Sequence, residues 1–183
     1  MADLLSDAKA VDAAVYAAIA ATDTPALDSA MRRLTRAADS SKLWFGTAAG
    51  LALFGGSRGR RAAVRGLASL GVGSAFANLV AKPLTVRSRP QREELEVLAR
   101  RHVPMPLSSS FPSGHAASAF AFATGAGNAQ PLLSAPLRAL ATLVGYSRVH
   151  TGVHYPADVL AGAFIGVSAA ELASRVLDTR AGR

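Results

Sequence analysis

Five apolar segments rich in glycine and alanine follow Lys42 and constrain the fold more than any other feature of the chain. They cover residues 43–56, 62–81, 116–127, 136–147 and 159–173. A helix that crosses a bilayer needs ~20 apolar residues, so most of these segments require flanking residues to reach that length. Small side chains at close spacing favour tight helix contacts in lipid. We therefore predict an all-α integral membrane bundle with five to six spanning helices. A soluble helical bundle is the alternative.

The first part of the chain has a different pattern and predicts two amphipathic helices. An alanine-rich run predicts the first helix over residues 8–21. This helix either enters the membrane as the sixth spanning helix or lies on the membrane interface. Asp3, Asp7 and Asp12 argue against a signal peptide, because such a peptide has a basic start and an uncharged apolar centre.

The second N-terminal helix is predicted to start at Pro25, with Thr24 as its N-cap. One face would carry Leu27, Met31 and Leu34, and the opposite face Arg32, Arg33 and Arg36. This pattern suits a solvated helix of the bundle and an interfacial helix equally well.

Composition limits the classes of partner. The chain has 183 residues, which suits one domain, and it has no cysteine, so neither a disulfide nor a thiolate zinc site is available. The net charge of +8 suits nucleic acid, anionic lipid or a phosphorylated substrate. Only 6% of the residues are aromatic and no lysine-rich tract occurs. We therefore expect no nucleic-acid partner.

The distribution of arginine predicts the orientation in the membrane. Basic residues cluster between the first two apolar segments and after the last one, at Arg58, Arg60, Arg61, Arg65, Arg175, Arg180 and Arg183. The positive-inside tendency places these residues in the cytoplasm. With five alternating segments, the stretches 82–114 and 147–158 then share the extracytoplasmic side. Every candidate site residue falls in these two stretches or at their borders.

The first candidate stretch is KPLTVRSRP at 82–90. Lys82 and Arg89 are about two helical turns apart and would point the same way if the segment were helical, and Pro90 stops any further helix. Two cations at one point suit a phosphoryl group. A basic collar that meets lipid headgroups is the equally weighted alternative.

The second stretch is SSSFPSGHAASAF at 108–120. A turn containing Ser113 and Gly114 directly precedes an alanine-rich helix, so the amide groups of 113–115 are expected to face outward at a helix start, which favours an anion. His115 lies in the first turn of that helix. A helix-capping or interfacial role for this histidine is the alternative.

The third stretch is SRVHTGVHYPAD at 147–158. His154 precedes Asp158 by four residues, at the start of the last apolar segment. A carboxylate that accepts a hydrogen bond from one imidazole nitrogen leaves the lone pair of the other nitrogen free to attack. Arg148 would add a third cation. Ionisable residues placed beside a membrane segment indicate a functional site.

Taken together, the three stretches resemble the signature of the type 2 phosphatidic acid phosphatase family. The matching patterns are K-x(6)-R-P at 82–90, P-S-G-H at 112–115 and S-R-x(5)-H-x(3)-D at 147–158. This family is related to lipid phosphate phosphatases, bacterial class A acid phosphatases and vanadium haloperoxidases. The resemblance covers roughly residues 43–175.

The resemblance implies a role for each matching residue. His154 resembles the nucleophile that forms a phosphohistidine, Asp158 its orienting partner and His115 the general acid. The residues that resemble the phosphate cradle are Lys82, Arg89, Ser113, Gly114 and Arg148. The family is metal-independent and implies no cofactor. His102 and His150 match no catalytic position and are interpreted as loop residues, with His150 close enough to touch substrate.

We divide the chain into three regions, of which the resemblance does not explain the first. These are the N-terminal amphipathic helices (1–42), a phosphatase membrane domain (43–177) and a basic tail (178–183). We expect a multi-pass protein of the cell membrane that acts on a lipid-anchored phosphate, polyprenyl-linked or phospholipid. Its expected partners are that substrate and membrane lipids, with a homo-oligomer left open. The alternatives are a vanadate-dependent peroxidase and a non-catalytic protein that binds anionic lipid.

Overall fold

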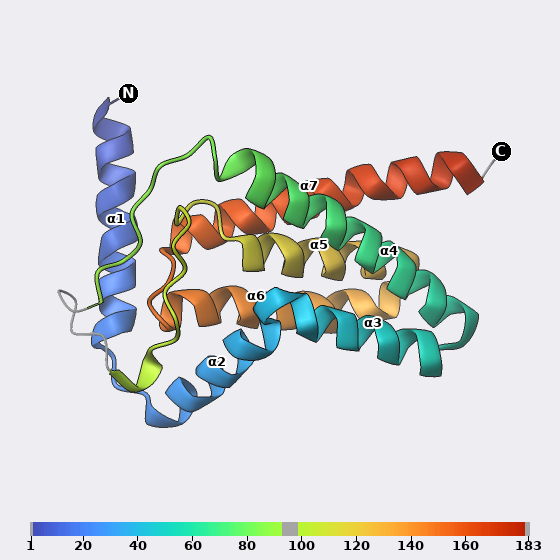
Figure 1. Ribbon diagram of the computed structural model, residues 1–183, viewed down its shortest axis with the longest axis horizontal. Helices are drawn as coiled ribbons and strands as arrows, with labels where there is room; N and C mark the ends of the chain where they lie inside the picture. The colour runs from blue at the N-terminus through green and yellow to red at the C-terminus, as the bar shows by residue number, and fades with distance from the viewer. Residues whose placement is uncertain (1, 93–98, 182–183) are drawn as a thin grey trace.

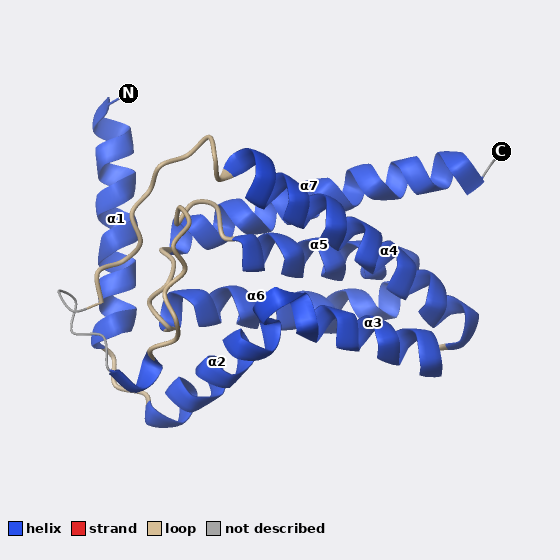
Figure 2. Ribbon diagram, in the orientation of Figure 1, coloured by secondary structure: helices blue, strands red, loops and turns tan. Residues whose placement is uncertain are grey.

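The protein is a helical bundle, without a strand in the part of the chain that the structure describes (Figure 2). This structure is a computed structural model that describes residues 2–92 and 99–181. The main helices are α1 (Ala2–Ala21), α2 (Pro25–Ala38), α3 (Lys42–Phe54), α4 (Gly56–Ala75), α5 (Gly114–Ala129), α6 (Ser134–His150) and α7 (Pro156–Ala181). Short turns of helix are η1 (Asp39–Ser41), η2 (Phe76–Ala81), η3 (Ala99–Arg101) and η4 (Pro131–Leu133). Each of the five predicted apolar segments therefore lies in or overlaps one of the helices α3 to α7.

Helix α5 is the centre of the bundle, because it packs against α4, α6 and α7 (Figure 1). Its contact with α7 is close because α7 has glycines where the two backbones meet. A Cβ atom added to Gly162 would lie 2.4 Å from the Ser113 carbonyl oxygen, and one added to Gly166 would lie 2.4 Å from the Ala117 carbonyl oxygen. Small residues thus bring α7 and the start of α5 together, as the glycine- and alanine-rich pattern predicts.

The other side of α5 packs on a cluster of buried apolar side chains. Trp44 of α3 and Phe122 of α5 have ring centroids 5.2 Å apart, and both side chains are almost fully buried. Alanines of α4 and α5, including Ala62 and Ala123, complete this cluster. Large aromatic side chains dominate the burial of a core like this one, so Trp44 fixes α3 against α5.

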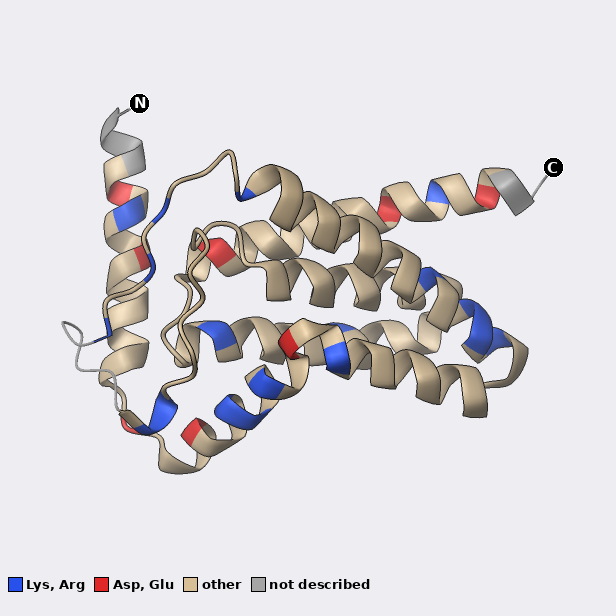
Figure 3. Cartoon of the chain, viewed as in Figure 1, with Lys and Arg blue, Asp and Glu red and all other residues tan. Residues whose placement is uncertain are grey.

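Large apolar side chains cover much of the outer face of the bundle. The exposed ones include Phe45, Leu53, Phe54, Val64, Leu79, Leu132, Leu160, Phe164 and Leu172. Figure 3 shows no charged residue along the middle part of α3, the helix that carries Phe45 and Leu53. An apolar surface of this extent is unusual on a soluble monomer and fits contact with lipid.

Two helices are long and apolar enough to span a membrane among the described residues: Gly56–Ala81 and Pro156–Thr179. The predicted number of five to six spanning helices is therefore not confirmed. Helices α3, α5 and α6 have 13, 16 and 17 residues. These lengths fall below the ~20 residues of a perpendicular span.

Helix α1 runs across one end of the bundle and contacts α6 and α7 there (Figure 1). It begins earlier than the predicted residue 8. Asp12, Tyr16 and Ala20 face the bundle, whereas Val11 and Val15 are exposed. The contact face repeats every four residues, which is the spacing of one helix face.

Helix α2 begins at Pro25 as predicted, but its details differ from the prediction. The hydroxyl of Thr24 donates to Asp28 Oδ1 (3.0 Å) and caps no backbone amide. The buried residues of α2 include Asp28 and Thr35, while Leu27 is exposed. The buried stripe is therefore partly polar, because arginines from elsewhere in the chain bind it. Residues 93–98 of the stretch 82–114 and residues 182–183 of the predicted tail, with Arg183, lie outside the described residues.

Candidate active site

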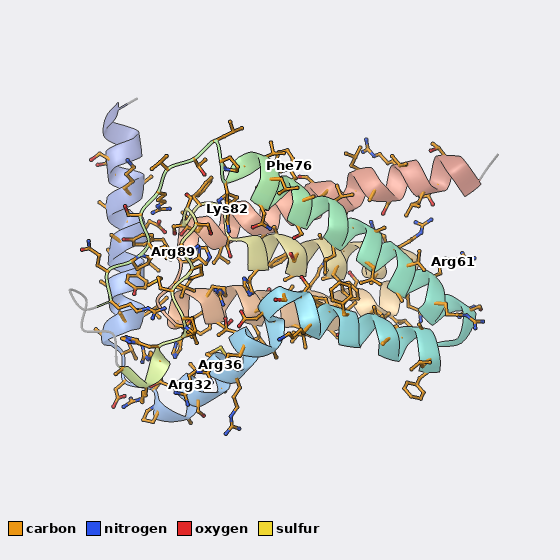
Figure 4. The ribbon with its side chains drawn as sticks, viewed as in Figure 1. Arg32, Arg36, Arg61, Phe76, Lys82 and Arg89 are labelled. Atoms are coloured by element: carbon orange, nitrogen blue, oxygen red, sulfur yellow. The ribbon has the colours of Figure 1, made fainter. Side chains whose placement is uncertain are left out.

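One pocket of about 210 Å³ brings together residues from all three predicted stretches. It lies at the end of the bundle that α1 crosses. The predicted residues that line it are Lys82, Arg89, Gly114, His115, Arg148 and His154. Figure 4 shows Lys82 and Arg89 at this end and Arg61 at the opposite end of α4. The predicted convergence of the cations and the two histidines is present in the fold.

His154 and Asp158 form a buried pair between α6 and α7. His154 Nδ1 lies 3.4 Å from Asp158 Oδ2, and both side chains are at most 2% exposed. The same carboxylate oxygen accepts from the Tyr155 amide (2.9 Å) and from the hydroxyl of Ser110. Since Asp158 lies in the first turn of α7, the helix start itself helps to hold this carboxylate. With Nδ1 donating to Asp158, the Nε2 lone pair of His154 faces the pocket.

Arg87 is a partner of Asp158 that the motif reading missed. Its Nη1 lies 2.7 Å from Asp158 Oδ1, and its Nη2 lies 2.5 Å from Asp12 Oδ2. The guanidinium also stacks over the ring of Tyr155, 4.5 Å from the ring centroid. Both oxygens of Asp158 therefore have hydrogen-bond partners, which hold the carboxylate in place. His154 Nδ1 thus faces one acceptor, Oδ2, in a fixed position.

Arg89 reaches the pocket from an irregular segment. The segment 82–89 is not helical, because the helical backbone ends at Ala81 and a turn follows, so the condition of a helical segment is not met. Arg89 donates to the carbonyl oxygens of Val153 (2.7 Å), Ser108 (3.0 Å) and Ser109 (3.2 Å). Its Nη1 also lies 3.3 Å from His154 Nε2. Three carbonyl contacts hold this guanidinium in place beside the histidine.

Arg148 approaches the pocket from the last turn of α6 and is almost fully buried. One of its nitrogens donates to the hydroxyl of Thr35 in α2, and Nη1 lies 3.8 Å from Asp39 Oδ1. Its buried Nε has no hydrogen-bond partner among the described residues. A guanidinium with an unused donor in a closed site is suited to bind an anion.

The start of α5 only partly matches the expected anion site. Gly114 and His115 line the pocket, whereas Ser113 is fully buried behind them. The amide of Ser113 donates to the Asp158 carbonyl (2.9 Å), and its hydroxyl accepts from the Ala116 amide (3.4 Å). The expectation that the Ser113 amide faces outward is therefore wrong. Ser113 caps α5 and connects it to α7. A Cβ atom added to Gly114 would lie 2.8 Å from Asn78 Oδ1, so a larger side chain at this position would displace the Asn78 side chain.

His115 has a carboxylate partner that the sequence reading did not identify. Its Nε2 lies 3.0 Å from Asp39 Oδ1, in the turn between α2 and α3. No local pattern marks Asp39, because it belongs to a polar turn far from the three motifs in sequence. Its side chain is about half exposed at the edge of the site.

The charges around the pocket favour an anion. Burial lowers the pKa of Lys82, and the neighbouring Arg89 and Arg148 lower it further. Burial also lowers the pKa of His154 to about 4, with the hydrogen bond to Asp158 acting in the opposite direction and the two arginines adding to the shift. His154 is thus neutral near pH 7. A bound dianion such as phosphate would relieve the electrostatic repulsion among these three cations.

A second buried ionic cluster lies next to the site and joins α2 to α6. His150 Nε2 and Arg101 Nε lie 2.8 and 2.7 Å from Asp28 Oδ1, and all three side chains are at most 1% exposed. His150 is the last residue of α6, so its interpretation as a loop residue is wrong. No group of three or more His, Asp or Glu residues suited to a metal ion occurs in residues 2–92 and 99–181.

The arrangement of the pocket agrees with a family comparison. The family model described as PAP2 superfamily matches residues 62–181, which include all eight predicted site residues. The chain belongs to the PAP2 superfamily. The matched residues begin inside α4, so α1, α2 and α3 lie outside them.

Relatives of this PAP2 member include enzymes named as phosphatases of lipid-linked substrates. Decaprenylphosphoryl-5-phosphoribose phosphatase of Mycolicibacterium smegmatis is 32% identical over 169 residues, which cover 88% of this chain and 84% of that protein. Lipid A 1-phosphatase of Porphyromonas gingivalis is 37% identical over 75 residues, which cover 39% of this chain and only 17% of that protein.

A crystal structure supports the fold. A transmembrane PAP2-type phosphatidylglycerolphosphate phosphatase from Bacillus subtilis superposes with a TM-score of 0.71 at 24% identity. The superposition covers 94% of this chain and 87% of the other. The fold is therefore that of a membrane PAP2 protein.

Proposed function

We propose that this PAP2 protein is a metal-independent phosphatase that removes phosphate from a membrane-anchored lipid phosphate through a phosphohistidine intermediate. The observation that carries the proposal is one pocket in which His154 and His115 stand with three cations. Phosphoryl transfer requires charge stabilisation around the phosphate oxygens, an in-line nucleophile and a protonated leaving group. In this proposal the three cations stabilise the charge, His154 is the nucleophile and His115 protonates the leaving group.

In the first half of the reaction, His154 Nε2 attacks phosphorus. The bond between phosphorus and the leaving oxygen breaks, and the leaving alkoxide takes a proton from His115. Asp158 accepts from Nδ1 and stabilises the positive charge that develops on the ring of His154. Lys82, Arg89 and Arg148 neutralise the phosphate oxygens.

In the second half, water attacks the phosphohistidine. His115, now neutral, accepts a proton from that water, and the bond between phosphorus and Nε2 breaks as inorganic phosphate forms. The amide of Gly114 at the start of α5 adds a hydrogen bond to the anion, since the first amides of a helix have no partner within it. Ser113 supports this step indirectly as the cap of α5.

The substrate is proposed to be polyprenyl-linked. The support is the mycolicibacterial relative, which the chain matches over most of its length and which is named for a decaprenyl-linked phosphoribose. A phospholipid phosphate is the second substrate class. The exposed apolar side chains of α3, α4 and α7 would lie in the bilayer that holds such an anchor.

We further propose a multi-pass topology with the pocket on the extracytoplasmic side. Arg58, Arg60, Arg61 and Arg65 begin α4 at the end opposite the pocket, and the positive-inside tendency assigns that end to the cytoplasm. Helix α1 would then lie along the extracytoplasmic interface beside the site. Its exposed Val11 and Val15 would meet lipid.

The test is phosphate release by purified protein from a panel of lipids. The panel contains a decaprenyl-linked phosphoribose, undecaprenyl phosphate, undecaprenyl diphosphate, phosphatidic acid and phosphatidylglycerol phosphate. We expect release from at least one of these lipids, and none with His154→Ala. Halide oxidation dependent on added vanadate, with no phosphate release, would instead identify a peroxidase. Equal lipid binding by parent and His154→Ala, with no turnover by either, would identify a lipid-binding protein.

A further inference from the structure

Asp39 stands beside the proposed general acid, in a turn that holds it at the rim of the pocket. Its neighbours Ala38, Ser40 and Ser41 line the pocket. Ser40 and Ser41 have φ angles of 53° and 60°, in the left-handed region that few residues other than glycine adopt. Two such residues in succession turn the chain sharply between α2 and α3. This turn places the Asp39 carboxylate over the start of α5.

The contacts of Asp39 differ from those of the other carboxylate at the site. Its Oδ1 lies 3.0 Å from His115 Nε2 and 3.8 Å from Arg148 Nη1. The side chain is 49% exposed, whereas Asp158 is fully buried and paired with Arg87 at 2.7 Å. Each histidine of the pocket thus has its own carboxylate, but only the one beside His115 is open to solvent, at the rim of the pocket.

We infer that Asp39 is a specificity-determining residue that selects phosphomonoesters, whose leaving group is an alkoxide, over diphosphates, whose leaving group is a phosphate. The inference rests on the proposed function, in which His115 donates its proton to the leaving oxygen. Asp39 contacts Nε2 of that histidine. A leaving group that takes its proton from His115 therefore lies close enough to Asp39 to interact with its negative charge.

The two classes of substrate respond to this carboxylate in opposite ways. A monoester leaves as an alkoxide, which needs a proton, and a carboxylate next to His115 stabilises the protonated imidazole that supplies it. When a diphosphate is hydrolysed, the leaving group is the lipid phosphate, which is a good leaving group and needs little help from the acid. That leaving group also carries negative charge, which Asp39 repels. Both effects therefore favour the monoester.

The test compares two matched pairs of substrates in mixed micelles. One pair is phosphatidic acid and diacylglycerol diphosphate with the same acyl chains, and the other is farnesyl phosphate and farnesyl diphosphate. Within each pair, only one phosphoryl group differs. For the parent protein we expect a higher kcat/KM with the monoester of each pair that it hydrolyses.

Asp39→Asn removes the charge and keeps an oxygen that can accept from His115. We expect kcat/KM for the monoester to fall about 10-fold, a part of the 10²–10⁴-fold that a general acid typically contributes. The kcat/KM for the diphosphate should stay the same or rise. Asp39→Glu, which restores the charge, should recover the preference for the monoester. The matched control is Asp178→Asn, which removes an exposed carboxylate that pairs with Arg65 of α4 and is expected to change neither value.

The outcomes separate the inference from the proposed function. Equal losses with both members of a pair in Asp39→Asn would mean that Asp39 only supports the fold, and would overturn the inference. A parent that prefers diphosphates would overturn it as well, while the phosphatase function stands. A parent that hydrolyses no member of either pair and no lipid of the panel would overturn both. Inhibition by inorganic phosphate, measured for each variant, reports whether the cation cradle is intact.

Discussion

Asp12 in the first helix and Asp158 in the last helix are held by one guanidinium. Arg87 donates to both carboxylates, and Asp12 Oδ1 also accepts from the amide of Ala157 (2.8 Å). Asp158 in turn contacts His154. Helix α1, which lies outside the residues matched by the family model, is therefore connected to the proposed nucleophile through two ionic contacts of Arg87 and the contact between Asp158 and His154.

The connection predicts a catalytic effect of a residue remote from the pocket. Asp12→Asn should lower kcat about 10-fold, the lower end of what outer partners of a site residue contribute. KM should change little, because the phosphate cradle is untouched. Asp7→Asn, an exposed carboxylate on the same helix, is the matched control and should have no effect. Unchanged kcat in Asp12→Asn would mean that Arg87 alone positions Asp158.

The parts of the site predicted from sequence lie beside the ends of apolar helices. Lys82 directly follows the helical segment that ends at Ala81, His115 lies in the first turn of α5 and Asp158 in the first turn of α7. Apolar periodicity and the turn residues Pro and Gly mark such ends in the sequence. The motifs therefore marked the helix ends that meet at the site, where Lys82 and His115 line the pocket and Asp158 lies behind it as the partner of His154.

The partners of these residues could not be predicted in the same way. Asp12, Asp28 and Asp39 all belong to the first 42 residues, and they pair with Arg87, Arg101 and His115, more than 70 positions away. Helical periodicity assigns a residue to a face of its own helix and says nothing of what packs on that face. An aspartate on an amphipathic helix is more often solvated, so Asp28 in the buried stripe of α2 had no signal in the sequence.

The protonation of His154 predicts a pH dependence of stability. Burial lowers the pKa of His154 to about 4 in the folded protein, below the ~6.5 of an unfolded chain. The unfolded state therefore binds the proton more tightly. Stability from this residue is fully present above about pH 6.5 and is lost as the pH falls towards about 4.

The measurement is a ring ¹³C titration of histidine-labelled protein in detergent, with thermal unfolding at each pH. The signal assigned to His154, by its absence from His154→Gln, should titrate near pH 4. The fall in Tm between pH 6.5 and 4 should be smaller in His154→Gln than in the parent. A resonance that titrates near 6.5 would contradict the predicted neutrality of the nucleophile.

The proposed reaction predicts a distinct response to metal chelators and to vanadate. Chelators should leave phosphate release intact, since charge stabilisation is assigned to Lys82, Arg89 and Arg148. Vanadate should inhibit, because it can adopt the trigonal-bipyramidal geometry of the transferred phosphoryl group. Activity lost with a chelator and restored by Mg²⁺ would refute the metal-independent mechanism.

The buried cluster around Asp28 predicts a large effect on stability. Asp28→Ala leaves the fully buried guanidinium of Arg101 without its carboxylate, and should destabilise the protein by about 3–5 kcal/mol. Asp23→Ala is the control, because Asp23 is 68% exposed and pairs with the partly exposed Arg100. An exposed pair contributes at most about 1 kcal/mol. Thermal unfolding in one detergent compares the two variants, and equal shifts in Tm would contradict a structural role for the cluster.

The separate roles of the two histidines predict different effects of their substitution. His154→Ala should abolish both turnover and the covalent phosphoenzyme. His115→Ala should cost about 10²–10⁴-fold with an alkyl phosphate and far less with a nitrophenyl phosphate, whose leaving group needs no proton. Asp158→Asn should resemble a milder His154 variant, because the ring stays in place while its developing charge loses the carboxylate.

Acid-labile, alkali-stable labelling of the protein from radiolabelled substrate measures the intermediate in the three variants. The label should be absent from His154→Ala and should still form in His115→Ala with the nitrophenyl substrate. A label that persists in His154→Ala would assign the nucleophile to another residue. His150 is a poor substitute, because its Nε2 contacts the buried Asp28 (2.8 Å) and it does not line the pocket. Equal losses for His115→Ala with alkyl and nitrophenyl substrates would remove its role as the acid, and with it the inferred role of Asp39.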